Sequence, residues 1–115
     1  MQIESVIFML MAQDMDRAVA FYHDVVGLDL RSASPRWSEL TRGDATVALH
    51  GGGDGEFHDT GLSFQVADLD AACQEVKRGG GRVVKSPEDR PGEPIRLARL
   101  ADTEGNGFTM SQYVG

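Results

Sequence analysis

Few side chains in this sequence are of a type that could carry chemistry. His50 ends a short segment rich in strand-forming residues, and an imidazole there can take up or release a proton near neutral pH. Glu39, on an earlier segment of the same kind, is a second candidate base. Trp37, the only tryptophan, offers a flat apolar surface for a planar ligand. Ligand binding is favoured over proton transfer, because a lone histidine at a strand end is usually a hydrogen-bonded surface residue.

Other reactive patterns are missing. Cys73 is the only cysteine and has no base beside it, so the sequence supports neither a disulfide, a zinc finger nor a cysteine nucleophile. The glycine clusters at residues 51–53 and 79–81 lack the spacing of phosphate-binding loops. His58 is surrounded by acidic residues, but its glycine-rich surroundings favour a solvated loop over a cation site. Nucleophilic catalysis and nucleotide binding are therefore not expected.

Composition sets the broad class. The chain has 115 residues, with 11 basic against 18 acidic side chains and a net charge of −7, and 41% of its residues are hydrophobic. This is the composition of a globular domain with a core. The acidic balance disfavours nucleic acid as a partner. No apolar run approaches the roughly 20 residues of a membrane span, and no signal peptide is recognisable, so a soluble, cytoplasmic protein is expected.

Hydrophobic periodicity predicts the same order of elements twice. Asp14 and Asp68 are each placed to cap a helix, and Asp68 follows Asp14 by 54 residues, close to half the chain. The predicted helices cover residues 15–26 and 69–78. The predicted strands are residues 5–11, 28–32, 37–41, 46–50, 62–66, 82–84, 95–100 and 107–112. We therefore expect an α+β fold of two tandem βαβββ modules in one domain, spanning residues 1–52 and 59–115, with a flexible glycine-rich connector between them and a charged loop over residues 86–94.

Two motifs carry a family resemblance. The first helix contains Asp-Met-Asp-Arg-Ala-Val-Ala-Phe-Tyr (residues 14–22), and Asp-Thr-Glu-Gly-Asn-Gly-Phe-Thr (residues 102–109) leads into the last strand. With the duplicated modules, they make almost the whole chain resemble the vicinal oxygen chelate superfamily, which includes glyoxalase I, extradiol dioxygenases, fosfomycin-resistance enzymes and metal-free bleomycin-resistance proteins. The resemblance implies a curved, half-barrel mixed sheet with helices on its convex side. Both motifs mark turns and helix starts, so they are silent about chemistry.

The resemblance also locates the family's metal site. Metal-dependent members hold their ion with four inward-pointing side chains, which correspond here to Ile7, Ala48, Gly61 (or Leu62, if the register slips by one) and Thr109. None of these is a usual ligand for zinc, nickel, iron or manganese. No metal and no other cofactor is therefore expected. Glyoxalase and dioxygenase activities, which depend on that metal, are not expected either, and whether the protein is an enzyme stays open.

Strand alternation extends the predicted pocket from those positions. Residues two apart share a face, so the core side of the first strand should carry Val6, Phe8 and Leu10. The remaining positions should line an apolar pocket with a few polar groups. The predicted ligand-binding residues are Ile7, Met9, Met11, Trp37, Ala48, His50, Ser63, Gln65, Arg99, Thr109 and Ser111.

Three functions are compatible with this pocket. The first is a metal-free protein of the bleomycin-resistance type that binds or sequesters a small apolar or planar organic ligand. The acidic net charge of the protein would favour a cationic ligand. The second is a metal-independent lyase, isomerase or epimerase with His50 or Glu39 as base. The third is an accessory module whose pocket is closed by its own side chains. In relatives the site forms between two chains or two repeats, so a homodimer is expected.

Overall fold

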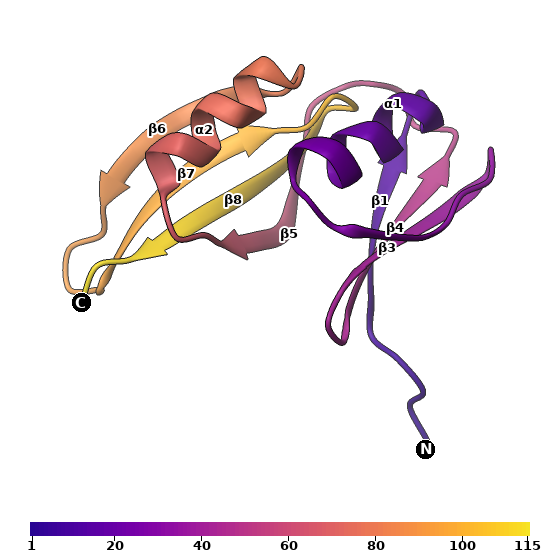
Figure 1. Cartoon of the computed structure of the whole chain (residues 1–115), viewed down its shortest axis with the longest axis horizontal. Helices are drawn as coiled ribbons and strands as arrows, with labels where there is room; N and C mark the ends of the chain where they lie inside the picture. Colours follow the sequence, from indigo (N-terminus) through magenta and orange to yellow (C-terminus); the bar gives the residue numbers. More distant parts are fainter.

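The computed structural model describes residues 1–115, and its first half forms a four-stranded sheet, sheet 1 (Figure 1). Sheet 1 has the strand order β1-β4-β3-β2, with β1 parallel to β4 and the other pairs antiparallel. The helical segment between β1 and β2 starts as an α-helix and continues as a π-helical turn. The elements are β1 (Ile7–Ala12), α1 (Met15–Ala20), the π-helical turn η1 (Phe21–Val25), β2 (Asp29–Ser32), β3 (Trp37–Arg42) and β4 (Ala45–Gly51).

The second half repeats this plan as sheet 2, with the strand order β5-β8-β7-β6 and β5 parallel to β8. Its elements are β5 (His58–Gln65), α2 (Leu69–Arg78), β6 (Arg82–Asp89), β7 (Ile95–Ala101) and β8 (Asn106–Tyr113). Both helical segments lie on the same side of the two sheets (Figure 1). The predicted α+β class with two tandem βαβββ modules, here called module 1 and module 2, is confirmed, and the two sheets form an open, half-barrel-like layer.

The helix boundaries follow from their caps. The Asp14 side chain accepts a hydrogen bond from the Arg17 N–H at 3.1 Å, and Asp68 accepts one from the Ala71 N–H at 3.0 Å, so each aspartate satisfies a free donor of a first turn. Gly27 has φ +90°, a conformation that ends the first helical segment at little cost for glycine. The predicted helix starts are confirmed at both positions.

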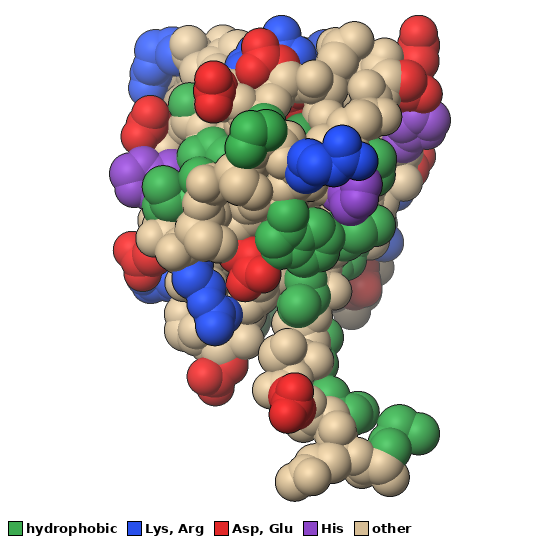
Figure 2. All heavy atoms as spheres, turned by 90° about the vertical axis from the view of Figure 1, so that its right-hand side faces the viewer, with side chains coloured by type: hydrophobic (Ala, Val, Ile, Leu, Met, Phe, Trp, Pro, Cys, Tyr) green, Lys and Arg blue, Asp and Glu red, His purple; other side chains and the backbone are tan.

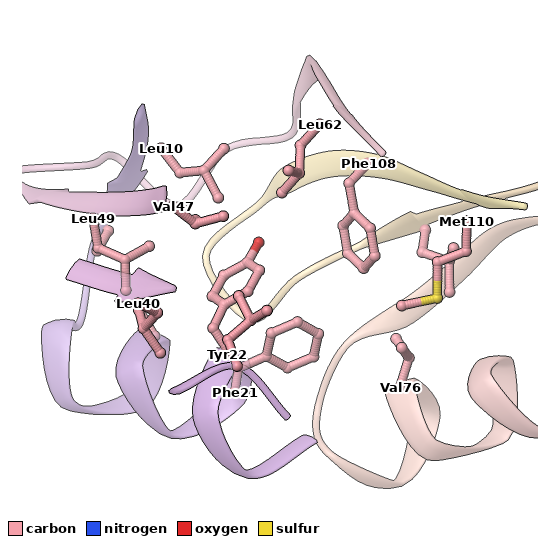
Figure 3. Packing of buried hydrophobic residues seen from close by; sticks show 14 of the residues in the cluster. Leu10, Phe21, Tyr22, Leu40, Val47, Leu49, Leu62, Val76, Phe108 and Met110 are labelled. Atoms are coloured by element: carbon pink, nitrogen blue, oxygen red, sulfur yellow. The ribbon is translucent and has the colours of Figure 1, made fainter. Parts of the chain in front are cut away.

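A hydrophobic core spans both modules. Seventeen buried residues from the two sheets and the helical segments form one cluster. Figure 3 shows Phe21 of η1 extending towards Phe108 of β8, with Tyr22 beside it. The rings of Phe21 and Phe108 meet edge to face with centroids 6.3 Å apart, a favourable geometry for aromatic pairs. The helical segment of module 1 thus packs on a strand of module 2, which fixes how the two sheets sit together.

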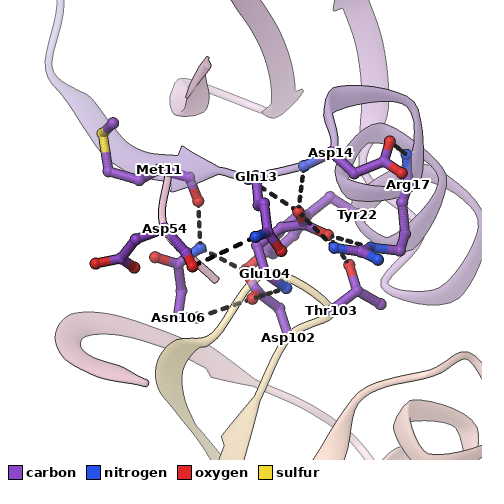
Figure 4. Close-up of polar contacts among 10 residues, drawn as sticks. All are labelled: Met11, Gln13, Asp14, Arg17, Tyr22, Asp54, Asp102, Thr103, Glu104 and Asn106. Atoms are coloured by element: carbon purple, nitrogen blue, oxygen red, sulfur yellow. Dashed lines mark hydrogen bonds and ion pairs between the residues drawn. The ribbon is translucent and has the colours of Figure 1, made fainter. Parts of the chain in front are cut away.

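A buried polar cluster reinforces this junction. The Tyr22 hydroxyl donates to Asp102 Oδ2 at 2.5 Å, and Asp102 also accepts from the Glu104 N–H and from both the backbone and the side chain of Asn106 (Figure 4). Burial and the neighbouring Asp102 carboxylate raise the pKa of Tyr22 well above its usual value. Tyr22 is therefore a neutral donor throughout the physiological range, and four hydrogen bonds satisfy the buried Asp102.

Glu104, two residues further on, binds the start of α1. Glu104 Oε1 accepts from the backbone N–H groups of Gln13 at 3.0 Å and Asp14 at 2.7 Å, and its carboxylate pairs with Arg17 at 2.8 Å. Burial by itself would raise the pKa of Glu104, but the hydrogen bonds from Arg17, Thr103 and the Asp14 N–H outweigh it and lower the pKa. Together, Arg17, Tyr22, Asp102, Glu104 and Asn106 are called the intermodule clamp below.

Three boundaries differ from the sequence-based predictions. Val6 is not packed under the helices but is 78% exposed, because pairing with β4 begins only at Ile7. The strand predicted at residues 82–84 continues to Asp89, because β7 is long enough to pair with all of β6 through irregular register shifts. Only residues 90–94 of the predicted loop therefore remain outside a strand. β5 begins at His58, before the predicted residue 62.

The glycine-rich connector is held in place rather than free. The Gly53 N–H donates to the Ala12 carbonyl at 2.9 Å, and the Gln13 side chain donates to the Asp54 carbonyl at 3.4 Å. A Cβ on Gly53 would lie 2.9 Å from the Ala12 backbone, so only glycine allows this approach. No helix in the structure has the length and apolar character needed to cross a membrane.

Candidate functional site

The outward face of sheet 1, opposite the helices, gathers the apolar candidate residues in cross-strand rows. Met11, His50 and Trp37 are in register across β1, β4 and β3, so they form one row. Met9, Ala48 and Glu39 form the next row, and Ile7 starts a third. Because residues two apart share a face of a strand, Ile7, Met9 and Met11 are partly exposed, while Leu10 and Ala12 on the other face are buried. Module 1 thus presents an apolar strip ending in an imidazole and an indole.

Local hydrogen bonds fix the indole of Trp37. Its Nε1–H donates to Glu39 Oε2 at 2.7 Å, and Arg31 Nη1 on β2 lies 3.6 Å from Glu39 Oε1. Both Glu39 oxygens are therefore occupied, one by the indole and the other by a partly exposed guanidinium. This arrangement orients the ring on the surface before any ligand arrives, which reduces the entropy lost on binding.

His50 has a defined tautomer. Its Nδ1 lies 2.6 Å from the carbonyl oxygen of Gly51, and because a carbonyl only accepts, Nδ1 carries the hydrogen. Nε2 of the neutral ring is left with a lone pair and no partner within the chain. The Trp37 ring meets the imidazole edge to face, with centroids 6.1 Å apart. His50 can therefore accept a hydrogen bond or a proton from a molecule lying against Trp37.

Module 2 presents a more polar outward face. Ser63, Thr109 and Arg99 are in register across β5, β8 and β7, and the Thr109 hydroxyl donates to Ser63 Oγ at 2.7 Å. Gln65 and Ser111 form the neighbouring row. The predicted ligand-binding residues therefore fall into an apolar group on sheet 1 and a polar group on sheet 2.

One chain does not enclose these two groups in a common pocket. Five cavities of about 100 to 450 Å³ lie in the structure, and none of them is lined by Trp37, His50, Ile7, Met9 or Met11. Met9 is 52% exposed, so the chain's own side chains do not close the strip either. Ala48 is fully buried between Met9 and Glu39 and adds no contact surface, contrary to expectation. Closing this site needs a second surface.

Figure 2 shows the same feature from the side formed by module 1. Hydrophobic side chains gather in the middle of this face, beside a histidine and a basic side chain, and more of them follow the N-terminal arm away from the body. Residues 1–6 of this arm have no regular secondary structure and are exposed. The apolar strip thus leads into an exposed arm that carries the hydrophobic side chains of Met1, Ile3 and Val6, as expected of a surface covered by another molecule.

The four positions of the family's metal site do not fit a metal. Ile7, Ala48 and Thr109 lie on the outward face, whereas a Cβ on Gly61 would lie 3.8 Å from the ring of Phe8, which packs against the core. None of the four offers an imidazole, carboxylate or thiolate, and no group of three or more His, Cys, Asp or Glu side chains in the structure is arranged to hold an ion. No step can be derived through a metal at this place.

Sequence reasoning missed two features of the site. Arg31 on β2 completes the fixation of Trp37 through Glu39, and only the cross-strand register reveals it. The motif from Asp102 to Asn106 was expected to be a turn, but it also supplies most of the intermodule clamp. The available signal was a pair of acidic residues, Asp102 and Glu104, in the short turn between two apolar strands.

Comparison with known proteins identifies the family. The sequence profile of the Glyoxalase/Bleomycin resistance protein/Dioxygenase superfamily matches residues 5–110. The chain belongs to this superfamily. A lactoylglutathione lyase of Haemophilus influenzae is 29% identical to it over 116 residues, covering 84% of this chain and 83% of that protein. The putative glyoxylase CFP32 of Mycobacterium tuberculosis is 33% identical over 107 residues; the match covers 88% of this chain but spans only 41% of that protein's length.

Among solved structures, one that this chain resembles is TnmS3, an antibiotic binding protein from Streptomyces sp. CB03234. It is 27% identical to this chain, superposes with a TM-score of 0.76, and the match covers 98% of each chain. The proteins that resemble this chain thus include a lyase and an antibiotic binding protein, and resemblance alone does not choose between these functions.

Proposed function

We propose that this protein binds, without a metal, a small planar and largely apolar organic molecule on the outward face of sheet 1, and that a second copy of the chain closes the site. The row of Met11, His50 and Trp37 carries this proposal, because it combines an exposed apolar surface, a pre-oriented indole and a free imidazole nitrogen. The inert residues at the family's metal positions support binding over metal-assisted turnover. The resemblance to an antibiotic binding protein agrees with this role.

The second copy of the chain supplies the missing wall. The strip on β1 is apolar and exposed, the arm before it exposes Met1, Ile3 and Val6, and β1 is an edge strand with unpaired backbone groups. A homodimer with two-fold symmetry would cover the same surface on both copies. The polar rows of module 2 would then face the apolar strip of the partner, giving each pocket one apolar and one polar wall.

Fluorescence of Trp37, the only tryptophan, provides the test. Titration with daunorubicin, a planar and cationic antibiotic, and with its uncharged aglycone should give saturable quenching, with tighter binding of the cation because the chain carries a net charge of −7. N-acetyltryptophanamide controls for absorption by the ligand, and sedimentation should show a dimer. Only linear, non-saturating quenching with these compounds and a wider panel of planar antibiotics would contradict the proposal.

The free Nε2 of His50 favours one second candidate. A ligand with an acidic C–H next to a carbonyl could lose that proton to His50, as in a metal-independent lyase or isomerase. Glu39 is a poorer base for this step, because Trp37 and Arg31 occupy its two oxygens. If a bound ligand is chemically converted during the titration, and His50→Gln abolishes the conversion, the protein is a lyase or isomerase and not a sequestering protein.

A further inference from the structure

A pair of adjacent cavities lies between the modules, outside the apolar strip of the candidate site. The larger has a volume of about 450 Å³ and the smaller about 370 Å³. Leu28, Arg42, Phe64 and Gln65 line both, so the two form one continuous recess, called the intermodule cavity below. Its volume is within the range of small-molecule sites. Ser63 and Gln65 of the polar rows line it, but Trp37, His50 and the apolar strip do not, so its occupant would lie apart from the ligand proposed above.

The internal repeat explains why this space is open. The intermodule clamp lies where the turn before β8 meets the helical segment of module 1. In the other repeat, the equivalent junction lies between the turn before β4 and α2. The 54-residue offset between the helices places Ala71 at the position of Arg17 and Val76 at that of Tyr22. Val76 lines the cavity. An aromatic ring in one repeat is thus replaced by a much smaller side chain in the other.

The two turns differ in the same direction. Met9 pairs with Ala48 as Ser63 pairs with Thr109, so the last strands of the modules correspond at an offset of 61 residues. This offset matches Glu104 with Gly43, Asp102 with Thr41 and Asn106 with Ala45. The carboxylates and the amide of the clamp therefore have no counterpart. One of the two equivalent junctions is filled by side chains of the chain, and the other is left hollow.

Arg42 gives the cavity its charge. It is the only charged residue among the twelve that line the larger cavity, whose other walls are mostly apolar. None of the ion pairs of the structure involves Arg42. In the filled junction, by contrast, the guanidinium of Arg17 is paired with Glu104. The exposed Glu75 lines only the smaller cavity, so an anionic group would be favoured on the side of the larger one.

We propose that the intermodule cavity binds a small aromatic carboxylate, with its ring between Leu28, Leu40 and Phe64 and its carboxylate on Arg42. Such a ligand would supply to this junction the two groups that Tyr22 and Glu104 supply to the other, a ring and a carboxylate. A guanidinium in partly apolar surroundings attracts a carboxylate strongly at short range. Salt screens the repulsion between the ligand and acidic side chains more than about 10 Å away, so the acidic net charge does not prevent binding.

Calorimetric titration with 2-naphthoate, together with ¹H–¹⁵N chemical-shift mapping, tests this site. The wild type should bind with shifts centred on Arg42 and Phe64, and Arg42→Gln should weaken binding at least tenfold. Arg78→Gln, an exposed arginine on α2 outside the cavity, is the matched control and should bind like the wild type. The uncharged 2-naphthamide should bind wild type and Arg42→Gln equally weakly. Trp37→Ala should leave the naphthoate-induced shifts at Arg42 and Phe64 unchanged, which separates this site from the candidate site.

Two results would overturn the proposal. One is naphthoate binding that is unaffected by Arg42→Gln, or whose chemical shifts centre on Trp37 and His50. The other is no detectable binding of naphthoate to the wild type at millimolar concentration. Because Arg42 is exposed, its substitution is not expected to affect folding, and the thermal midpoint of Arg42→Gln checks this.

Discussion

Asp102→Ala should lower the free energy of unfolding by about 3 kcal/mol, because it removes the acceptor of four hydrogen bonds at a buried position. The Tyr22 hydroxyl would lose its acceptor while it stays buried, and the turn that presents Glu104 to α1 would lose its internal bonds. Urea unfolding at neutral pH, followed by circular dichroism, measures the change. Tyr22→Phe should cost less, about 1 kcal/mol, because only one donor disappears.

A surface ion pair supplies the control for this prediction. Asp70→Ala breaks the pair between Arg96 and Asp70, whose carboxylate is well exposed, and should change stability by no more than about 1 kcal/mol. An Asp102→Ala protein as stable as Asp70→Ala would show that the clamp does not join the modules. The hydrophobic core alone would then hold the two modules together.

Trp37→Ala should weaken binding of a planar ligand at least tenfold, since it removes the stacking surface and the indole held by Glu39. Trp37→Phe should give an intermediate loss, because a smaller ring remains. Since both variants lack the fluorescent reporter, binding is followed by calorimetry or by the fluorescence of daunorubicin itself. The ring lies on the outward face and is only half-buried, so the fold should persist in both variants.

Tyr113→Ala is the matched control for loss of an aromatic ring. Tyr113 ends β8 and is 60% exposed, away from the row of Met11, His50 and Trp37. Its removal should leave ligand affinity unchanged. Equal losses of affinity in Tyr113→Ala and Trp37→Ala, or no loss in Trp37→Ala, would place the ligand elsewhere on the molecule.

The fold was predictable because local signals repeat. Asp14 and Asp68 mark the helix starts, Gly27 ends the first helical segment, and the 54-residue spacing of the two caps exposes the duplication. Alternation along β1 and β4 also predicted which side chains face the core, since Phe8, Leu10, Val47 and Leu49 all contact it, although Ala48 on the other face is buried as well. Patterns of this kind depend only on the period of a strand or helix, and the sequence displays that period directly.

The parts that were not predicted depend on long-range register. Val6 has the composition of a strand residue, yet it stays unpaired because β4 offers it no partner. The length of β6 depends on how far β7 reaches beside it, and Arg31 joins the site only through the pairing of β2 with β3. The clamp and the hollow junction opposite it depend on which strands of the two repeats pair, and the sequence does not show that pairing.

The site itself was predictable as a face but not as a pocket. Period-two alternation assigned Ile7, Met9 and Met11 to one side, and the structure places them there. It could not show that these residues lie on a different sheet from Arg99 and Ser111, nor that one chain leaves them open. Enclosure depends on how two sheets, or two chains, face each other, and no local pattern encodes that arrangement.

Metal dependence is the most direct test of the central claim, that this member of the superfamily binds its ligand through apolar and hydrogen-bonding contacts alone. Protein treated with EDTA and 1,10-phenanthroline should be titrated calorimetrically with daunorubicin, before and after addition of zinc, nickel, manganese or ferrous iron. We predict the same affinity in every sample and no stoichiometric metal by elemental analysis of the untreated protein. Binding that disappears on chelation and returns with one equivalent of metal per site would contradict the account.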